Sequence, residues 1–85
     1  MKVLVKFFVF DLPPGFQDAE LELNDNALLK DVVDACLELF KQRGVKMDET
    51  ELRTSTILID GKWSELSAPV SGAGTITIIR PMDGG

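Results

Sequence analysis

One stretch of the chain, residues 27–43, spaces its apolar side chains at the three- and four-residue steps of an α-helix. The preceding Asn24-Asp25-Asn26 predicts an N-cap, and Gly44 predicts a left-handed residue after the last turn. A helix with one apolar stripe needs one surface to cover it, and here that surface is expected to be a single sheet. The stripe consists of Leu29, Val32, Val33, Cys36, Leu37 and Phe40.

The rest of the chain carries the pattern of short β-strands. Asp60-Gly61 predicts a two-residue hairpin turn that leads into a short strand at Lys62-Trp63. Residues 45–53 and 67–74 have no such pattern and are expected to be irregular. One helix on one sheet makes a two-layer α+β fold. Alternation with β-branched and aromatic residues predicts the longer strands at residues 2–10, 19–23, 56–59 and 75–79.

The first predicted strand has two different faces. Alternation places one set of apolar side chains on the face that meets the core, namely Val3, Val5, Phe7 and Val9. The opposite face carries Leu4, Lys6, Phe8 and Phe10. Lys6 marks this second face as the wetter one, so Phe8 and Phe10 are large apolar groups where polar ones are expected.

Composition excludes several classes of function. The chain has 85 residues with no histidine and one cysteine, which rules out His-based triads, disulfides within the chain and iron–sulfur clusters held by four thiolates. Fourteen acidic and nine basic residues give a net charge of −5, which argues against nucleic acid as a partner. No apolar run approaches the ~20 residues of a membrane span, and the N-terminus is unlike a signal peptide. We expect a cytoplasmic protein with no membrane partner and no metal site.

The last two residues, Gly84-Gly85, follow closely on the last predicted strand. A glycine carboxylate has no side chain beside the reacting carbon, and two glycines let the backbone enter a channel too narrow for a Cβ atom. Residues 80–85 are expected to form a flexible tail that spans about 20 Å when extended. Such a tail can be threaded into the active site of another enzyme and activated there as an acyl-adenylate.

The order of these elements, ending in Gly84-Gly85, resembles the MoaD/ThiS-type ubiquitin-like sulfur carriers, and most of all the small subunit of molybdopterin synthase. The resemblance implies a ubiquitin-like β-grasp, a single domain over residues 1–85 with one helix packed on a mixed four- to five-stranded sheet. One departure lies at Ser71-Gly72-Ala73-Gly74, where such carriers usually have an acidic turn. The segments behind the resemblance are residues 2–8, 57–62 and 75–85.

The resemblance also implies a chemical role. An E1-like enzyme would use ATP to adenylate the Gly85 carboxylate, and sulfur would then replace AMP to leave a thiocarboxylate, with Gly84 helping the tail to thread. The acceptor would be the large subunit of molybdopterin synthase, in molybdenum cofactor biosynthesis, or another sulfur-accepting enzyme. The chain would be no enzyme on its own and would bind no cofactor. The alternatives are a carrier for thiazole, cysteine or tRNA thiolation, a protein modifier conjugated through Gly85, or an interaction module whose Gly-Gly is inert.

A partner-docking face is expected beside the tail. In a β-grasp sheet the first and last strands are parallel neighbours, so Phe8 and Ile79 should lie close together on the face away from the helix. Trp63, after the Asp60-Gly61 turn, could cover the same region. Large exposed apolar patches usually mark interfaces. The expected docking residues are Phe8, Trp63, Ile79, Arg80, Pro81 and Met82.

Two other features are expected to be structural. Cys36 falls on the apolar stripe of the helix, where a free cysteine is commonly a small core residue rather than a reactive thiol. The acidic residues Asp48, Glu49 and Glu51 lack the glycine and the ligand spacing of a calcium loop, and we expect a solvated loop there.

Overall fold

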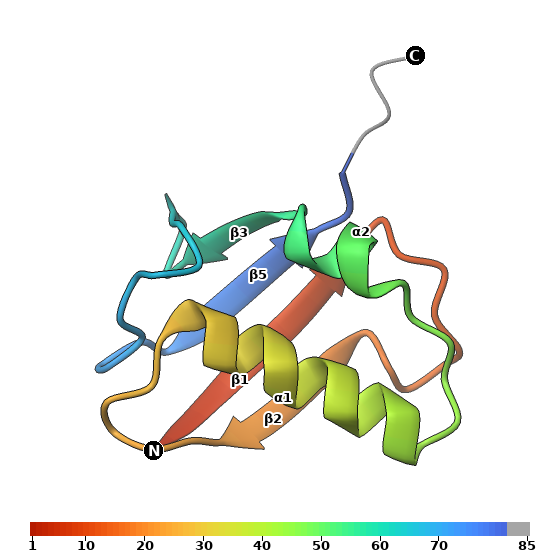
Figure 1. Ribbon diagram of the computed structural model, residues 1–85, viewed down its shortest axis with the longest axis horizontal. Helices are drawn as coiled ribbons and strands as arrows, with labels where there is room; N and C mark the ends of the chain where they lie inside the picture. The colour runs from red at the N-terminus through yellow and green to blue at the C-terminus, as the bar shows by residue number, and fades with distance from the viewer. Residues whose placement is uncertain (82–85) are drawn as a thin grey trace.

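The computed structural model describes residues 1–81, which form one mixed sheet with helices packed on it (Figure 1). The sheet has five strands in the order β2-β1-β5-β3-β4. β1 and β5 are parallel, whereas β1–β2, β3–β5 and β3–β4 are antiparallel. The expected α+β architecture is therefore confirmed. The strands are β1 Lys2–Phe8, β2 Asp18–Glu22, β3 Thr56–Ile59, β4 Lys62–Trp63 and β5 Thr75–Ile79, and the helices are α1 Leu29–Gln42 and α2 Glu49–Arg53.

The core lies between α1 and one face of the sheet. The aromatic ring of Phe40, near the end of α1, lies 5.2 Å from the ring of Phe7 on β1 (centroid to centroid). Each fully buried aliphatic or aromatic side chain of this kind contributes about 1.5–3 kcal/mol to folding. Of the predicted stripe only Leu37 is partly exposed. The buried residues of α1 are Leu29, Val32, Val33, Cys36 and Phe40, and those of β1 and β5 are Val3, Val5, Phe7, Ile76 and Ile78.

The start of α1 differs from the prediction. The N-cap is Leu28, and the Asp31 carboxylate accepts a hydrogen bond from the Leu28 backbone N–H at 2.8 Å. The Asn24 carbonyl accepts from the Ala27 N–H at 3.0 Å, so the asparagine cluster forms a turn before the helix instead of capping it. The predicted end is confirmed, since Gly44 has a left-handed φ of 71°.

β1 ends at Phe8, two residues before the predicted end. Val9 has a φ of 70°, a left-handed conformation that ends the alternation of faces. As a result Val9, expected in the core, is 61 % exposed. Phe10, expected on the wet face, packs edge-on against Phe7 with ring centroids 6.1 Å apart.

The segment predicted as a solvated loop, residues 45–53, contains α2. The Asp48 carboxylate accepts from the Glu51 backbone N–H at 3.1 Å and caps this short helix. α2 forms because it buries Leu52 completely against the core. Val70 is likewise fully buried, although residues 67–74 around it are irregular as expected.

Candidate docking face

The side chains of the sheet that point away from α1 form what we call the open face. They alternate along each strand with the buried residues, so their positions follow from the strand register. Most are polar or partly exposed, but several large apolar groups interrupt them. The open face consists of Lys2, Leu4, Lys6 and Phe8 from β1, Asp18, Glu20 and Glu22 from β2, Thr75, Thr77 and Ile79 from β5, Thr56 and Leu58 from β3, and Trp63 from β4.

Phe8 and Ile79 lie side by side at one end of this face. They are direct partners in the parallel register of β1 and β5, which confirms the expected proximity. Phe8 is 49 % exposed and Ile79 is partly buried. The Arg80 N–H donates to the Phe8 carbonyl at 3.1 Å and extends the ladder by one residue. An apolar pair therefore lies at the point where the chain leaves the sheet.

Trp63 shares the open face but lies farther away than expected. It is 66 % exposed and pairs with Leu58, which pairs in turn with Thr77. β4 is three strands from β1, so at ordinary strand spacing the backbones of Trp63 and Phe8 are at least about 14 Å apart. Leu58, which was not among the expected docking residues, lies between them. Its position could have been identified from the alternation along β3, because Thr56 and Leu58 flank the buried Ile57 and therefore share the opposite face.

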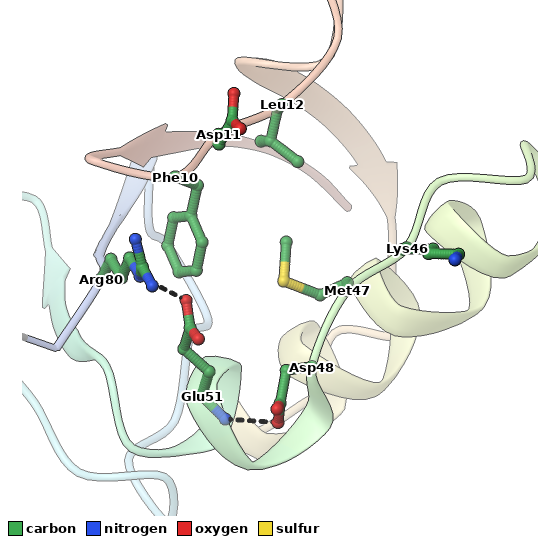
Figure 2. Close-up of a pocket in the computed structure, with 8 residues that line it drawn as sticks. All are labelled: Phe10, Asp11, Leu12, Lys46, Met47, Asp48, Glu51 and Arg80. Carbon is green, nitrogen blue, oxygen red and sulfur yellow. Dashed lines mark hydrogen bonds and ion pairs between the residues drawn. The ribbon is translucent and has the colours of Figure 1, made fainter.

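Arg80 is anchored to α2 (Figure 2). Its guanidinium Nε pairs with the Glu51 carboxylate at 2.5 Å, next to Phe10 and Met47. The groove around this ion pair has a volume of about 300 Å³. Pro81 is partly buried, and the remaining expected tail residues, Met82, Gly84 and Gly85, lie outside the described residues. The Arg80–Glu51 pair thus connects the last described residues of the chain to α2.

The acidic residues near α2 have structural partners. Asp48 caps α2, Glu49 pairs with Arg53 at 3.2 Å, and Glu51 pairs with Arg80. The Arg53 guanidinium donates hydrogen bonds to Asp34 and to Glu49. Both bonds raise the pKa of Arg53, and the bond to Asp34 has the larger effect. Across residues 1–81, no three His, Cys, Asp or Glu side chains come together as a metal site. In the same residues, neither helix is long and apolar enough to cross a membrane.

Cys36 lies in the core, as expected, and is fully buried. Burial raises the pKa of its thiol from 9.0 to about 12. A thiol needs a lowered pKa and access to solvent to act as a nucleophile at neutral pH. The geometry therefore gives Cys36 a packing role.

Asp60 connects two turns at the other end of the sheet. Its φ of 49° and the φ of 85° at Gly61 confirm the expected two-residue hairpin turn. The Asp60 carboxylate accepts from the backbone N–H groups of Gly74 at 3.1 Å and of Thr75 at 2.9 Å. It thus supplies a carboxylate at the turn before β5, where residues 71–74 have none.

The comparisons with known proteins concern the fold. No protein-family model and no curated protein sequence matches the chain. Among solved structures, SAMP1 of Haloferax volcanii matches with a TM-score of 0.66 and 17 % identity, over 100 % of both chains. A Pyrococcus furiosus protein described as molybdopterin converting factor subunit 1 matches with a TM-score of 0.67 and 17 % identity, over 96 % of this chain and 99 % of that one.

Ubiquitin of Caldiarchaeum subterraneum is similar in the same way, with a TM-score of 0.63, 17 % identity and coverage of 100 % of this chain and 98 % of that one. In each case the match extends over almost the full length of both chains, while sequence identity is low. Structural similarity at such low sequence identity establishes the fold of the chain. The chain has a ubiquitin-like β-grasp fold.

Proposed function

We propose that this protein is a ubiquitin-like sulfur carrier whose Gly85 carboxylate is adenylated by an E1-like enzyme and then converted to a thiocarboxylate. The observation that carries the proposal is the Phe8–Ile79 pair, a partly exposed apolar patch at the base of the segment that ends in Gly84-Gly85. A partner that covers this patch would hold that segment at its own active site. The fold likeness to a protein described as molybdopterin converting factor subunit 1 supports the same role.

The chemistry needs two steps at Gly85. A carboxylate oxygen attacks the α-phosphorus of ATP and releases pyrophosphate, which gives the acyl carbon a good leaving group. Hydrosulfide, or a persulfide whose S–S bond a partner thiol then cleaves with formation of a disulfide, attacks that carbon, releases AMP and leaves the thiocarboxylate. We assign the acid, base and metal chemistry of both steps to partner enzymes. The sulfur nucleophile must also come from a partner, because Cys36 is buried and its thiol has a pKa of about 12.

For the acceptor we propose the large subunit of molybdopterin synthase, with molybdopterin formation as the pathway. The second candidate is a protein modifier joined to lysines through Gly85. It is supported by the fold likeness to small archaeal modifier protein 1 and to an archaeal ubiquitin. Both functions begin with adenylation and differ in what attacks the adenylate, sulfur or an amine.

The test is capture of partners from the source organism with the full chain carrying an affinity tag at its N-terminus, which leaves Gly85 free. Recovery of an adenylating enzyme with a large molybdopterin synthase subunit supports the carrier. Recovery of many proteins linked through lysine to Gly85 supports the modifier. A matched bait that lacks Gly85 should retain non-covalent partners but lose adenylation, which is measured as exchange of labelled pyrophosphate into ATP. Pyrophosphate exchange that persists without Gly85 would contradict both candidates.

A further inference from the structure

β2 lies at one edge of the sheet, with β1 on its inner side (Figure 1). Among residues 1–81, no strand pairs with its outer side. Leu23 and Met1 exchange backbone hydrogen bonds of 2.8 and 2.7 Å, and the Phe7 N–H donates to the Gln17 carbonyl. In an antiparallel pair the bonded positions alternate, so the N–H and C=O groups of Ala19 and Leu21 point toward β1. Those of Asp18, Glu20 and Glu22 point to the free edge.

A groove runs between this edge and α1. Phe16, Ala19 and Leu39 form its apolar lining, Gly15 lies beside them, and Arg43, Asp18 and Glu20 are its charged lining residues; its volume is about 220 Å³. Sites for whole small molecules usually have volumes of about 300–1,000 Å³. This groove therefore suits single aliphatic side chains of an added strand better than a small molecule.

The other face of the same edge is acidic. Asp18, Glu20 and Glu22 are all exposed and lie on the open face, in register with β1. On the inner side of β2, two of these carboxylates already have a lysine of β1 as cross-strand partner: Lys6 lies opposite Asp18, and Lys2 lies opposite Glu22. On the free side of β2 the same carboxylates have no strand opposite them in the described part of the chain. Opposite charges directly across a strand pair stabilise pairing.

We propose that the free edge of β2 binds an extended peptide segment of a partner protein as a sixth strand. Residues of that segment opposite Asp18, Glu20 and Glu22 would be basic, since their side chains lie on the open face. Residues between them would be aliphatic, since their side chains enter the groove beside Leu39. Main-chain hydrogen bonds provide the affinity in this kind of recognition, and alternate side chains provide the specificity.

A second copy of this chain is a poor occupant of the edge. Antiparallel pairing of two β2 strands about Glu20 would place Glu20 opposite Glu20 and Asp18 opposite Glu22. Like charges directly opposite one another destabilise strand pairing. The acidic edge thus opposes self-association, as charged edge strands commonly do, while it favours a basic partner.

The experiment is a titration of the full-length ¹⁵N-labelled protein with a capped peptide of alternating Val and Lys, followed by NMR. We expect saturable shifts at Asp18, Glu20 and Glu22 and at Phe16 and Leu39, with slower amide exchange at the three acidic positions. A block peptide of the same composition and an alternating Val–Glu peptide serve as controls. Equal shifts with the block peptide, shifts confined to Phe8 and Trp63, or no saturation would overturn the proposal.

Two variants separate strand addition from attraction between charges. Glu20→Pro removes an outward N–H that β1 does not use and should weaken binding about tenfold or more, whereas Glu20→Gln keeps the N–H and should weaken it far less. The double variant Glu20→Lys/Glu22→Lys, which keeps every backbone group, should prefer the Val–Glu peptide. Equal affinities of Glu20→Pro and Glu20→Gln, or failure of the double variant to change preference, would contradict strand addition. None of these measurements involves Gly85, so the proposed carrier function is tested separately.

Discussion

Phe8 and Ile79 are direct partners across the parallel strands β1 and β5, and both side chains lie on the face of the sheet that α1 leaves uncovered. Their neighbours in sequence, Phe7 and Ile78, are also partners, but on the buried face. One step along either strand therefore separates a candidate docking residue from a core residue. This relationship allows the two roles to be tested with matched substitutions.

Phe8→Ala and Ile79→Ala should each weaken binding to the activating enzyme by about 30-fold, as expected for anchors worth ~2 kcal/mol. Phe7→Ala should instead lower the free energy of unfolding by about 3–5 kcal/mol, because it leaves a cavity beside Phe40. Titration calorimetry and chemical denaturation measure the two effects. Lys2→Ala, on the same face at the far end of β1, is the control for binding. If Phe8→Ala unfolds the protein while Phe7→Ala changes only binding, the assignment of the two faces is wrong.

Trp63 is the only tryptophan in the chain, so its fluorescence reports on the β4 end of the open face. Because its side chain is 66 % exposed, its emission should shift to shorter wavelength when a partner covers it. Trp63→Ala should then weaken docking, with little loss of stability. If binding that depends on Phe8 leaves the emission unchanged, the interface covers the Phe8–Ile79 end alone.

Cys36→Ser places a hydroxyl group in the core and should lower the free energy of unfolding by about 1–3 kcal/mol, with sulfur loading at Gly85 unchanged. The raised thiol pKa also predicts a pH dependence. Below pH 9.0 the thiol is protonated in both states; between pH 9.0 and about 12 the unfolded chain loses the proton while the folded chain keeps it. Stability should therefore fall as pH rises, by up to about 1.4 kcal/mol per pH unit from this group.

The measurement for Cys36 is the difference in unfolding free energy between the natural sequence and Cys36→Ala. This comparison cancels the titration of lysines and of the backbone termini. The difference should shrink above pH 9.0 and be constant below it. A constant difference at every pH, or a sulfur-loading defect in a folded Cys36 variant, would contradict the packing role.

Asp60 offers a test of how the start of β5 is held. Asp60→Gly keeps the left-handed backbone without strain but removes the acceptor for the Gly74 and Thr75 N–H groups. It should lower the free energy of unfolding by about 1–2 kcal/mol. Asp60→Asn tolerates the same φ and retains one side-chain oxygen, so its loss should be smaller. Equal unfolding free energies of Asp60→Gly and Asp60→Asn would show that the hydrogen bonds accepted by the Asp60 side chain do not stabilise the start of β5.

The positions of the strands along the chain and the buried stripe of α1 were largely predictable because they depend on periodicity, which the sequence displays directly. The end of β1 was not, because the left-handed φ at Val9 has no sequence signal in a β-branched residue. α2 was missed although Asp48 and Glu51 have the spacing of a capped helix start. A five-residue helix has almost no periodicity, and it depends on the tertiary burial of Leu52 in addition to its cap.

The candidate docking face was predictable in part. Alternation placed Phe8 and Ile79 on the open face, and the resemblance to β-grasp carriers supplied their adjacency. The distance of Trp63 from them depends on β3 lying between β5 and β4, which alternation alone cannot give. The ion pair between Arg80 and Glu51 depends on α2 and was therefore missed with it.

The most direct test of the central claim is the intact mass of the protein after incubation with its adenylating enzyme, ATP and a sulfur donor. We predict a gain equal to one oxygen-to-sulfur exchange, located at Gly85 by fragmentation and absent when Gly85 is deleted or blocked by a C-terminal tag. An unchanged mass with an enzyme proven to bind through Phe8 and Ile79, or sulfur found on Cys36 instead, would contradict it.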